Sequence, residues 1–240
     1  ITGIEALIRW NHPLRGVIGP GEFLATSEVA GLAPAIGCKV FEYAMVAIQG
    51  WVDEGLEFGR LAVNLSPGHL MKGSIIDDFF GIMEKYNIEP RLLTVEFLES
   101  LVIDDPNANI METLHRFRLR DVHVELDDFG TGYASLSHLS TMPINGLKID
   151  KTFVDQMTKD TRQQGIVTSL ISMAKLMKLR VVCEGIETRQ QVDVIAQIGK
   201  CSIQGYFITK PMSYQKTTDW LKSKRNIGAL RAHPEMVRTR

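Results

Sequence analysis

The chain has 240 residues, a formal net charge of −1 and a hydrophobic fraction of 45%. This length fits a single α/β barrel with a large apolar core, and the nearly balanced charge argues against binding to DNA, RNA or an anionic membrane. We find no signal peptide and no apolar run long enough to span a bilayer. We therefore expect a cytoplasmic domain, whose parent protein can still carry a membrane anchor.

The three cysteines and six histidines show no metal-ligand spacing. We expect Cys38, Cys183 and Cys201 to be buried thiols in a reducing compartment, without a disulfide. Each histidine is expected to be solvated or satisfied within the core rather than to bind a metal.

Short β-rich runs alternate with amphipathic helical patterns along the whole chain. The predicted strands cover residues 4–8, 61–65, 92–97, a run from Val124, 146–149, 179–183 and 202–203. The predicted helices cover residues 23–30, 36–52, 75–86, 109–119, 165–177, 189–198 and 214–221. A loop rich in glycine and proline follows the first strand, Gly31 and Pro34 separate the first two helices, and the helix-start signal Ser66-Pro67 closes the strand at 61–65. Regular alternation of this kind indicates a parallel sheet with both faces covered.

The predicted strands number about seven, whereas a closed (β/α)8 barrel has eight. We therefore expect a TIM-like barrel that lacks its first strand, with the missing strand before Ile1 in a longer protein. The barrel is expected over residues 1–222. Residues 223–240 are expected to form a basic, solvated tail.

Polar side chains stand at the ends of the predicted strands, which meet at one mouth in a parallel barrel. The most marked are Asp127 and Asp128, which end an apolar segment and precede Gly130 and Gly132. Adjacent buried carboxylates repel each other unless a cation lies between them, so one interpretation is a divalent metal site. A turn, in which an aspartate bonds the backbone and the glycines take positive φ, explains the doublet alone equally well.

The strand ends together supply mainly oxygen ligands and one lysine. The set in chain order is Glu5, Asn64, Glu96, Glu99, Asp127, Asp128, Lys148, Asp150, Glu184 and Glu187. Because no histidine or cysteine recurs among them, Mg²⁺ or Mn²⁺ is favoured over zinc. Lys148 lies in an apolar run, where an ammonium group needs a nearby anion or a catalytic task. An ion pair that closes the barrel mouth is the structural alternative.

Seven motifs follow one another along residues 5–212. They are Glu5-Ala6-Leu7 with Ile8-Arg9-Trp10, Asn64-Leu65-Ser66, Glu96-Phe97-Leu98-Glu99-Ser100, Asp127-Asp128-Phe129-Gly130-Thr131-Gly132-Tyr133, Lys148-Ile149-Asp150, Glu184-Gly185-Ile186-Glu187-Thr188 and Gln204-Gly205-Tyr206. Together they resemble the signature of the EAL domain, a family that hydrolyses the bacterial second messenger cyclic di-GMP. Each motif alone is weak, but the ordered set is specific.

The resemblance implies a role for each matching position. The implied metal ligands, for two Mg²⁺ or Mn²⁺ ions, are Glu5, Asn64, Glu96, Asp127 and Asp128. Lys148 matches a lysine that holds the attacking water, Glu184 a glutamate that binds metal or its attached water, and Gln204 a glutamine in the same pocket. Arg9 resembles an arginine that contacts the substrate phosphate. Asp150 and Glu187 stand where the family handles the nucleotide, and Glu99 matches a glutamate that steadies the loop after the aspartate doublet.

Two positions depart from the family pattern. Leu98 stands where the family usually has threonine, so a hydroxyl group near the loop is absent. Glu125, two residues before Asp127, shares its face of the strand, where the family more often has a small residue. The sequence does not choose between a neutralised Glu125, one paired within the barrel, and one close enough to influence a metal.

The sequence therefore predicts a metal-dependent phosphodiesterase domain that converts cyclic di-GMP to linear pGpG. Sensor or cyclase domains are expected beside it in the parent protein, and a homodimer is expected through the loop near Asp128. The rival hypothesis is a non-catalytic cyclic di-GMP receptor, which binds without turnover. The strand ends alone also leave open a metal-dependent lyase that uses Lys148 as a base or Schiff-base amine.

Overall fold

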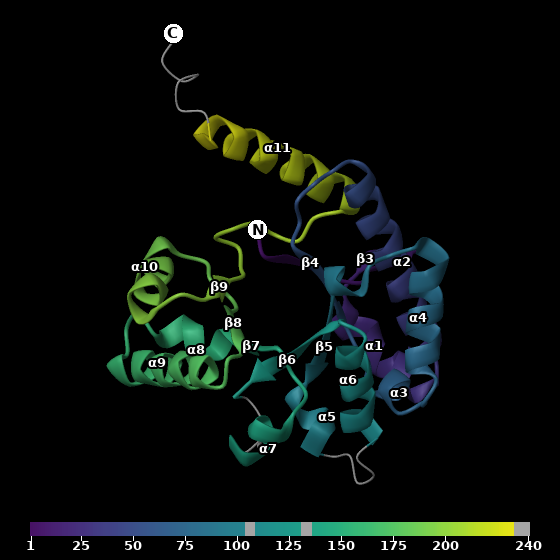
Figure 1. The fold of residues 1–240 in the computed structure, drawn as a ribbon, viewed down its shortest axis with the longest axis horizontal. Coiled ribbons are helices and arrows are strands. Elements are labelled where there is room, and N and C mark those ends of the chain that lie inside the picture. Colours follow the sequence, from purple (N-terminus) through teal and green to yellow (C-terminus); the bar gives the residue numbers. More distant parts are fainter. Residues whose placement is uncertain (104–108, 131–135, 233–240) are drawn as a thin grey trace.

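Seven parallel strands form one sheet whose order follows the chain. The computed structural model describes residues 1–103, 109–130 and 136–232. The strands, in their order across the sheet, are β1 (Gly3–Ala6), β4 (Arg60–Asn64), β5 (Leu93–Leu98), β6 (His123–Phe129), β7 (Gly146–Ile149), β8 (Arg180–Cys183) and β9 (Ser202–Ile203). The sheet curls into an incomplete barrel with the helices outside it (Figure 1). This arrangement confirms the predicted TIM-like fold that lacks a strand.

Helices follow most of the strands and cover the outer face of the sheet. They are α1 (Pro20–Val29), α2 (Ala33–Asp53), α3 (Pro67–Leu70), α4 (Ile75–Tyr86), the 3₁₀ turn η1 (Pro90–Leu92), α5 (Glu99–Ile103), α6 (Asn109–Leu119), α7 (Leu136–Thr141), α8 (Lys151–Gln156), α9 (Thr161–Leu176), α10 (Arg189–Ile198) and α11 (Tyr214–Ala232). No described helix has both the length and the apolar character needed to cross a bilayer.

Alternation along each strand separates the apolar core from the polar interior of the barrel. In β6, Val124 and Leu126 are wholly buried and belong to the core between the sheet and the helices. Glu125, from the opposite face of β6, lines the cavity inside the barrel together with Glu96 and Lys148. Successive side chains of a strand point to opposite faces, so each strand carries core residues and interior polar residues at the same time.

The two edge strands of the sheet are joined by side chains. Among the described residues β1 pairs only with β4, and β9 pairs only with β8. The hydroxyl oxygens of Thr2 and Ser202 lie 3.2 Å apart, and Gln204 Nε2 donates a hydrogen bond of 2.7 Å to Glu5 Oε2. The barrel wall is therefore open between these strands, where the sequence predicts the missing one.

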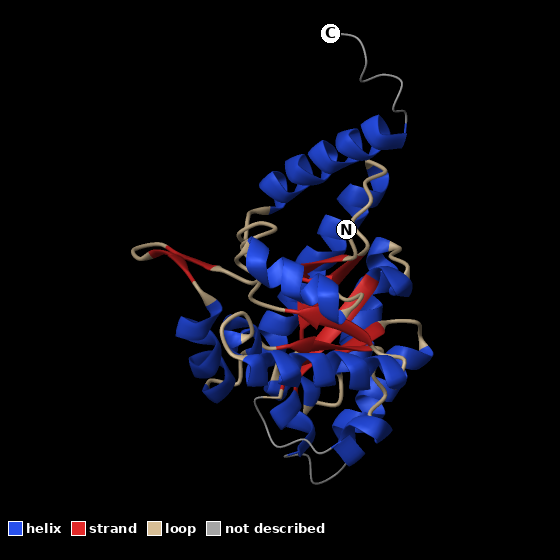
Figure 2. Cartoon of the chain, turned by 90° about the vertical axis from the view of Figure 1, so that its left-hand side faces the viewer, coloured by secondary structure: helices blue, strands red, loops and turns tan. Residues whose placement is uncertain are grey.

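One segment predicted as a loop is an antiparallel hairpin. β2 (Trp10–His12) and β3 (Gly16–Ile18) pair in register and project from the body of the domain (Figure 2). The prediction was wrong because each strand has only three residues, too short for an alternating pattern to stand out from the neighbouring turn residues.

The helix bounds also differ from the prediction at two proline residues and at the C-terminal side. Pro20 and Pro34 lie in the first turns of α1 and α2, where a missing backbone N–H costs no helical hydrogen bond. The final helix α11 continues past the predicted boundary at residue 222 as far as Ala232. Residues 233–240 lie outside the described residues, so the division into a barrel and a tail stays a prediction.

Candidate active site

Four carboxylate groups from separate parts of the sheet surround one buried ammonium group. The exposed fraction of Lys148 is 2%. Its Nζ lies 2.8 Å from Glu184, 3.0 Å from Glu96, 3.2 Å from Asp127 and 3.6 Å from Glu5. These groups lie together because the carboxyl ends of parallel barrel strands meet at one mouth. The structure thus brings together five of the residues that the sequence singled out.

Two amide side chains hold Glu5 from either side. Asn64, the last residue of β4, donates a hydrogen bond of 2.8 Å from Nδ2 to Glu5 Oε1. Gln204, just after β9, donates one of 2.7 Å from Nε2 to Oε2. Both oxygens of Glu5 are therefore positioned, and the two predicted amide residues belong to the same cluster.

The aspartate doublet combines a backbone irregularity with a cluster of oxygen donors. The pairing of β6 with β7 shifts register between Leu126 and Phe129, and Asp128 has a left-handed φ of 53°. The backbone N–H of Asp128 donates to Asp127 Oδ1 at 3.0 Å. One carboxylate oxygen from each of Asp127, Asp128 and Glu184 lies within 4.8 Å of the others. The doublet therefore combines an irregular turn with a cluster of carboxylate oxygens.

Glu99 contacts the segment that follows the doublet. Its exposed fraction is 3%, and its Oε2 accepts a hydrogen bond of 3.1 Å from the backbone N–H of Gly130. Gly130 has a φ of +96°, a conformation that favours glycine. The expected steadying of the loop beyond Gly130 falls on residues 131–135, which lie outside the described residues.

Burial, and after it the charges of neighbouring carboxylates, raises the pKa values of several acidic groups in the site. Burial raises the pKa of Glu184 to about 7, with Asp127 adding to the effect and Lys148 opposing it. Burial, followed by the charges of Glu5 and Asp127, holds the pKa of Glu96 well above its ordinary value. Burial also lowers the pKa of Lys148, but the surrounding carboxylates more than offset this and raise it above its usual range. Lys148 is therefore a firmly protonated cation.

The chemistry of the donor set fits divalent metal ions that prefer oxygen ligands. Four carboxylates face a single ammonium group, so their full ionisation leaves excess negative charge. Burial and the neighbouring Asp127 and Asp150 raise the pKa of Asp128 as well. Raised carboxyl pKa values mark a site with too little positive charge, and a bound cation reverses them. A carboxylate and amide set without sulfur or imidazole suits Mg²⁺ or Mn²⁺.

Three residues predicted to bind substrate lie outside the carboxylate cluster. Arg9 donates from Nη1 to its neighbour's carbonyl oxygen, Ile8 O, at 2.8 Å, and it lines the interior cavity. Asp150 caps α8 by accepting from the N–H of Thr152 at 2.9 Å. Glu187 forms an ion pair with Lys151. The structure assigns these residues local partners, and their roles toward a substrate stay predictions.

Lys151 is a site neighbour that sequence reasoning missed. Its side chain packs over Gly185, where an added Cβ would lie only 2.3 Å from Lys151 Cγ, and Gly185 has a φ of +66°. This glycine belongs to the segment that joins Glu184 to Glu187. The position of Lys151, directly after the strand-end residues Lys148 and Asp150, was the signal that could have pointed to it.

The two departures from the family pattern have different surroundings. Leu98 is paired with Asp127 in the register of β5 and β6, and its exposed fraction is 38%. Glu125 is 8% exposed, and His123 Nε2 lies 3.1 Å from its Oε1. That nitrogen makes no hydrogen bond within the described residues, so the closeness of the two groups does not choose among the three interpretations of Glu125.

A cavity of about 730 Å³ leads from the open wall to this cluster. Its lining includes Glu5, Arg9, Glu96, Lys148 and Gln204. The lining also includes Arg60 and Arg180 at the starts of β4 and β8, so part of this space is the gap in the barrel wall, whereas barrel enzymes act at the carboxyl ends of their strands. The fold and the site together therefore define an α/β barrel of the enzyme type with an acidic, lysine-centred pocket.

The comparison with known proteins places this barrel in a family. The EAL domain family matches residues 1–211, so the chain belongs to the EAL domain family. The chain is 34% identical over 212 residues to the bifunctional diguanylate cyclase/cyclic di-GMP phosphodiesterase MucR of Pseudomonas aeruginosa, covering 88% of this chain and 31% of that protein. It is 33% identical over 221 residues to the cyclic di-GMP phosphodiesterase PA2567 of the same organism, covering 92% of this chain and 37% of that protein. The chain thus spans about a third of the length of these curated relatives.

A solved structure has the same fold over nearly the whole chain. The PaMucR phosphodiesterase in complex with c-di-GMP superposes with a TM-score of 0.85 at 33% identity, covering 90% of this chain and 87% of that one. This agreement confirms the family membership expected from the motifs.

Proposed function

We propose that this chain is a phosphodiesterase that hydrolyses cyclic di-GMP to linear pGpG with the help of Mg²⁺ or Mn²⁺. The observation that carries the proposal is the cluster of Glu5, Glu96, Asp127 and Glu184 within 3.6 Å of Lys148 Nζ. The relatives named as cyclic di-GMP phosphodiesterases and the neighbour solved with c-di-GMP support this choice of substrate.

The same relatives bear on which domains flank this one in its parent protein. Because the matched relatives are about three times longer than the chain and one is named a bifunctional cyclase and phosphodiesterase, we propose flanking signalling domains in the parent protein. The homodimer and the cytoplasmic location stay predictions.

The residues present would hold two divalent ions. One would be held by Asp127, Asp128 and Glu184, whose oxygen atoms already lie close together. The other would be held by Glu5, Asn64, Glu96 and Asp127. Bound divalent ions supply positive charge that screens an anionic phosphodiester and lowers the pKa of water.

Lys148 and Glu184 have different roles toward the attacking water. In the cation-free site the surrounding carboxylates raise the pKa of Lys148, and we propose that its ammonium group donates hydrogen bonds that orient the water. Its firm protonation also argues against the lyase alternative, because a Schiff base forms from a neutral amine. Glu184 lies 2.8 Å from Lys148 Nζ, and we propose that it takes up the proton of the water that Lys148 orients.

The atoms of the reaction balance without any further reactant. The water oxygen forms a bond to phosphorus, its proton passes to a carboxylate such as Glu184, and the bond from phosphorus to the 3′ oxygen breaks. The leaving oxygen takes up a proton and becomes a hydroxyl group. Arg9 lines the same cavity, and we propose that its guanidinium group leaves its bond to Ile8 O to neutralise a phosphate oxygen during this step.

The test compares two glutamate substitutions in one turnover assay. Glu5→Ala removes a carboxylate of the cluster, and we expect loss of pGpG formation in the presence of Mg²⁺ or Mn²⁺. Glu84→Ala is the matched control, because Glu84 is exposed on α4, away from the strand ends, and it should leave the rate unchanged. Equal rates for both variants would overturn the proposal. Binding of cyclic di-GMP by the unmodified, metal-loaded chain without any pGpG would establish the receptor alternative instead.

A further inference from the structure

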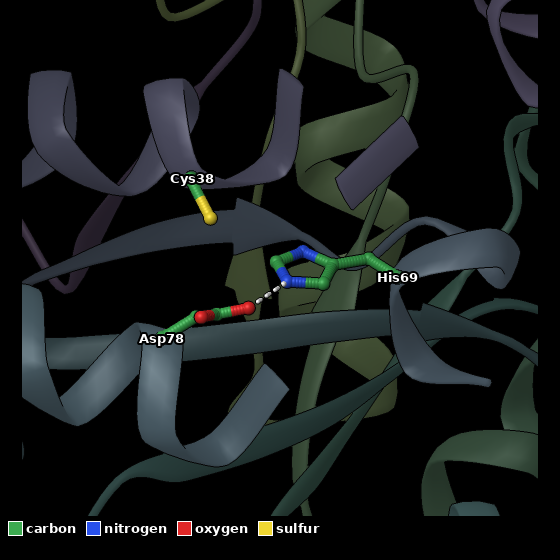
Figure 3. Close-up of side chains that lie close together, drawn as sticks. All are labelled: Cys38, His69 and Asp78. Carbon is green, nitrogen blue, oxygen red and sulfur yellow. Dashed lines mark hydrogen bonds and ion pairs between the residues drawn. The ribbon is translucent and has the colours of Figure 1, made fainter. Parts of the chain in front are cut away.

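Three potential metal ligands from separate helices meet outside the barrel. Cys38 lies in α2, His69 in α3 and Asp78 in α4, and their side chains converge in one place (Figure 3). One ligand atom from each lies within 4.8 Å of the others. The residues are far apart in the sequence, so their spacing gave no sign of a cluster. The group belongs to the helical layer, and none of its members takes part in the carboxylate cluster around Lys148.

The separation of two of the three ligand atoms is compatible with a shared tetrahedral zinc ion. His69 Nε2 lies 3.3 Å from Asp78 Oδ2. This separation is longer than the usual distance of about 2.9–3.0 Å for an N–H···O bond. Bonds of about 2.0–2.1 Å from a tetrahedral zinc ion to nitrogen and oxygen place these two ligand atoms about 3.3 Å apart. A thiolate, an imidazole and a carboxylate are also the ligand types that zinc accepts.

Packing holds the imidazole ring of His69 in place. The side chain is 1% exposed and stacks on Phe41, with ring centroids 5.5 Å apart. Gly37 lies against the other side, because an added Cβ there would be only 2.2 Å from His69 Nδ1. Nδ1 itself is buried without a hydrogen-bond partner among the described residues. The ring is therefore oriented by its neighbours, with Nε2 directed at the carboxylate.

Asp78 is held in place by a neighbour on its own helix. Ser74 Oγ donates a hydrogen bond of 2.9 Å to Asp78 Oδ2, which orients the carboxylate. The side chain of Asp78 is 32% exposed, which gives an ion access from solvent.

We propose that Cys38, His69 and Asp78 bind a zinc-type divalent ion that ties α2, α3 and α4 together outside the active site. Three protein ligands leave the fourth tetrahedral position to water. The ion is of a different class from the oxygen-bound ions of the barrel, because the thiolate and imidazole select a softer metal. Its role is to stabilise the helical layer behind the strand that ends at Asn64.

Cobalt is the probe that separates this site from the active site. Co²⁺ bound by a thiolate gives a sulfur-to-metal charge-transfer absorption, and the carboxylate cluster has no cysteine ligand among the described residues. We expect one equivalent of Co²⁺ to produce this absorption in the chelator-stripped chain under reducing conditions. Subsequent addition of Zn²⁺ should remove it and raise the melting temperature.

Substitutions assign the signal to Cys38. Cys38→Ser should abolish the absorption, and Ser74→Ala, which keeps all three ligands, should weaken Co²⁺ binding by about 10- to 100-fold. The matched control is Cys201→Ser, because Cys201 is not one of the three proposed ligands. Its Sγ lies 3.7 Å from that of Cys183. That variant should keep the absorption. Absence of the absorption in the unmodified chain, or its persistence in folded Cys38→Ser protein, would overturn the proposal.

Discussion

The pKa of Glu184 predicts how the stability of the metal-free chain depends on pH. Its pKa is about 7 in the folded chain, against an ordinary value of 4.5. A raised pKa in the folded state means that the folded state binds the proton more tightly. The stabilising contribution is therefore complete below about pH 4.5 and is lost as the pH rises through about 7. The difference between the two pKa values corresponds to about 3 kcal/mol.

The substitution Glu184→Gln should remove this part of the pH dependence. Glutamine is neutral at every pH, so the variant loses the ionisation cost but also weakens the contact with Lys148. The pKa of about 7 already includes the attraction of Lys148 for the ionised carboxylate, so that attraction adds no separate pH dependence. We therefore expect the free energy of unfolding of the unmodified chain, relative to that of the variant, to fall by about 2–3 kcal/mol between pH 5 and pH 8.

Urea unfolding in the presence of a chelator measures this difference. Glu84→Gln serves as the matched control, because it makes the same chemical change on the exposed side of α4, and its pH dependence should follow the unmodified chain. Addition of Mg²⁺ or Mn²⁺ at pH 8 should recover the lost stability, since a bound cation favours the ionised carboxylates. Parallel curves for the unmodified chain and Glu184→Gln would refute the reasoning about this carboxyl group.

Three further predictions concern neighbouring residues. Lys148→Met should abolish turnover. It should also lower the free energy of unfolding at neutral pH, measured in urea, by about 3–5 kcal/mol, because it leaves buried carboxylates without the ammonium group of Lys148. Glu99→Gln should reduce the turnover number while cyclic di-GMP affinity, measured by calorimetry, stays within about twofold, since a charge-assisted bond to Gly130 worth about 1.5–3 kcal/mol is weakened. Glu125→Gln should leave turnover within about twofold, because this carboxylate is not one of the four within 3.6 Å of Lys148 Nζ; a loss as large as that of Glu5→Ala would show that Glu125 acts in the site.

The parallel barrel and its acidic pocket were predictable from strand patterns. Runs such as the one ending at Asn64 alternate with long helical patterns, and parallel strands bring their carboxyl ends together. Knowing the strand ends was therefore enough to place Glu5, Glu96, Asp127, Lys148 and Glu184 in one group. The hydrogen bonds of Asn64 and Gln204 to Glu5 follow from the same geometry.

The features that were missed depend on contacts that sequence periodicity does not encode. The hairpin of β2 and β3 has three residues in each strand, so local pairing and not an alternating pattern defines it. The closeness of His123 and Glu125 depends on both side chains facing the interior from the same strand. Cys38, His69 and Asp78 meet only because α2, α3 and α4 pack side by side. Helix packing therefore creates a cluster that no spacing rule would reveal.

The central claim is that the acidic pocket hydrolyses cyclic di-GMP when divalent ions are present. The most direct measurement follows cyclic di-GMP and pGpG over time with the purified chain, first with Mn²⁺ or Mg²⁺, then after chelation, and finally after metal is restored. We predict that pGpG accumulates, stops forming on chelation and forms again when metal returns. A folded, metal-loaded chain that leaves cyclic di-GMP intact throughout would contradict the claim.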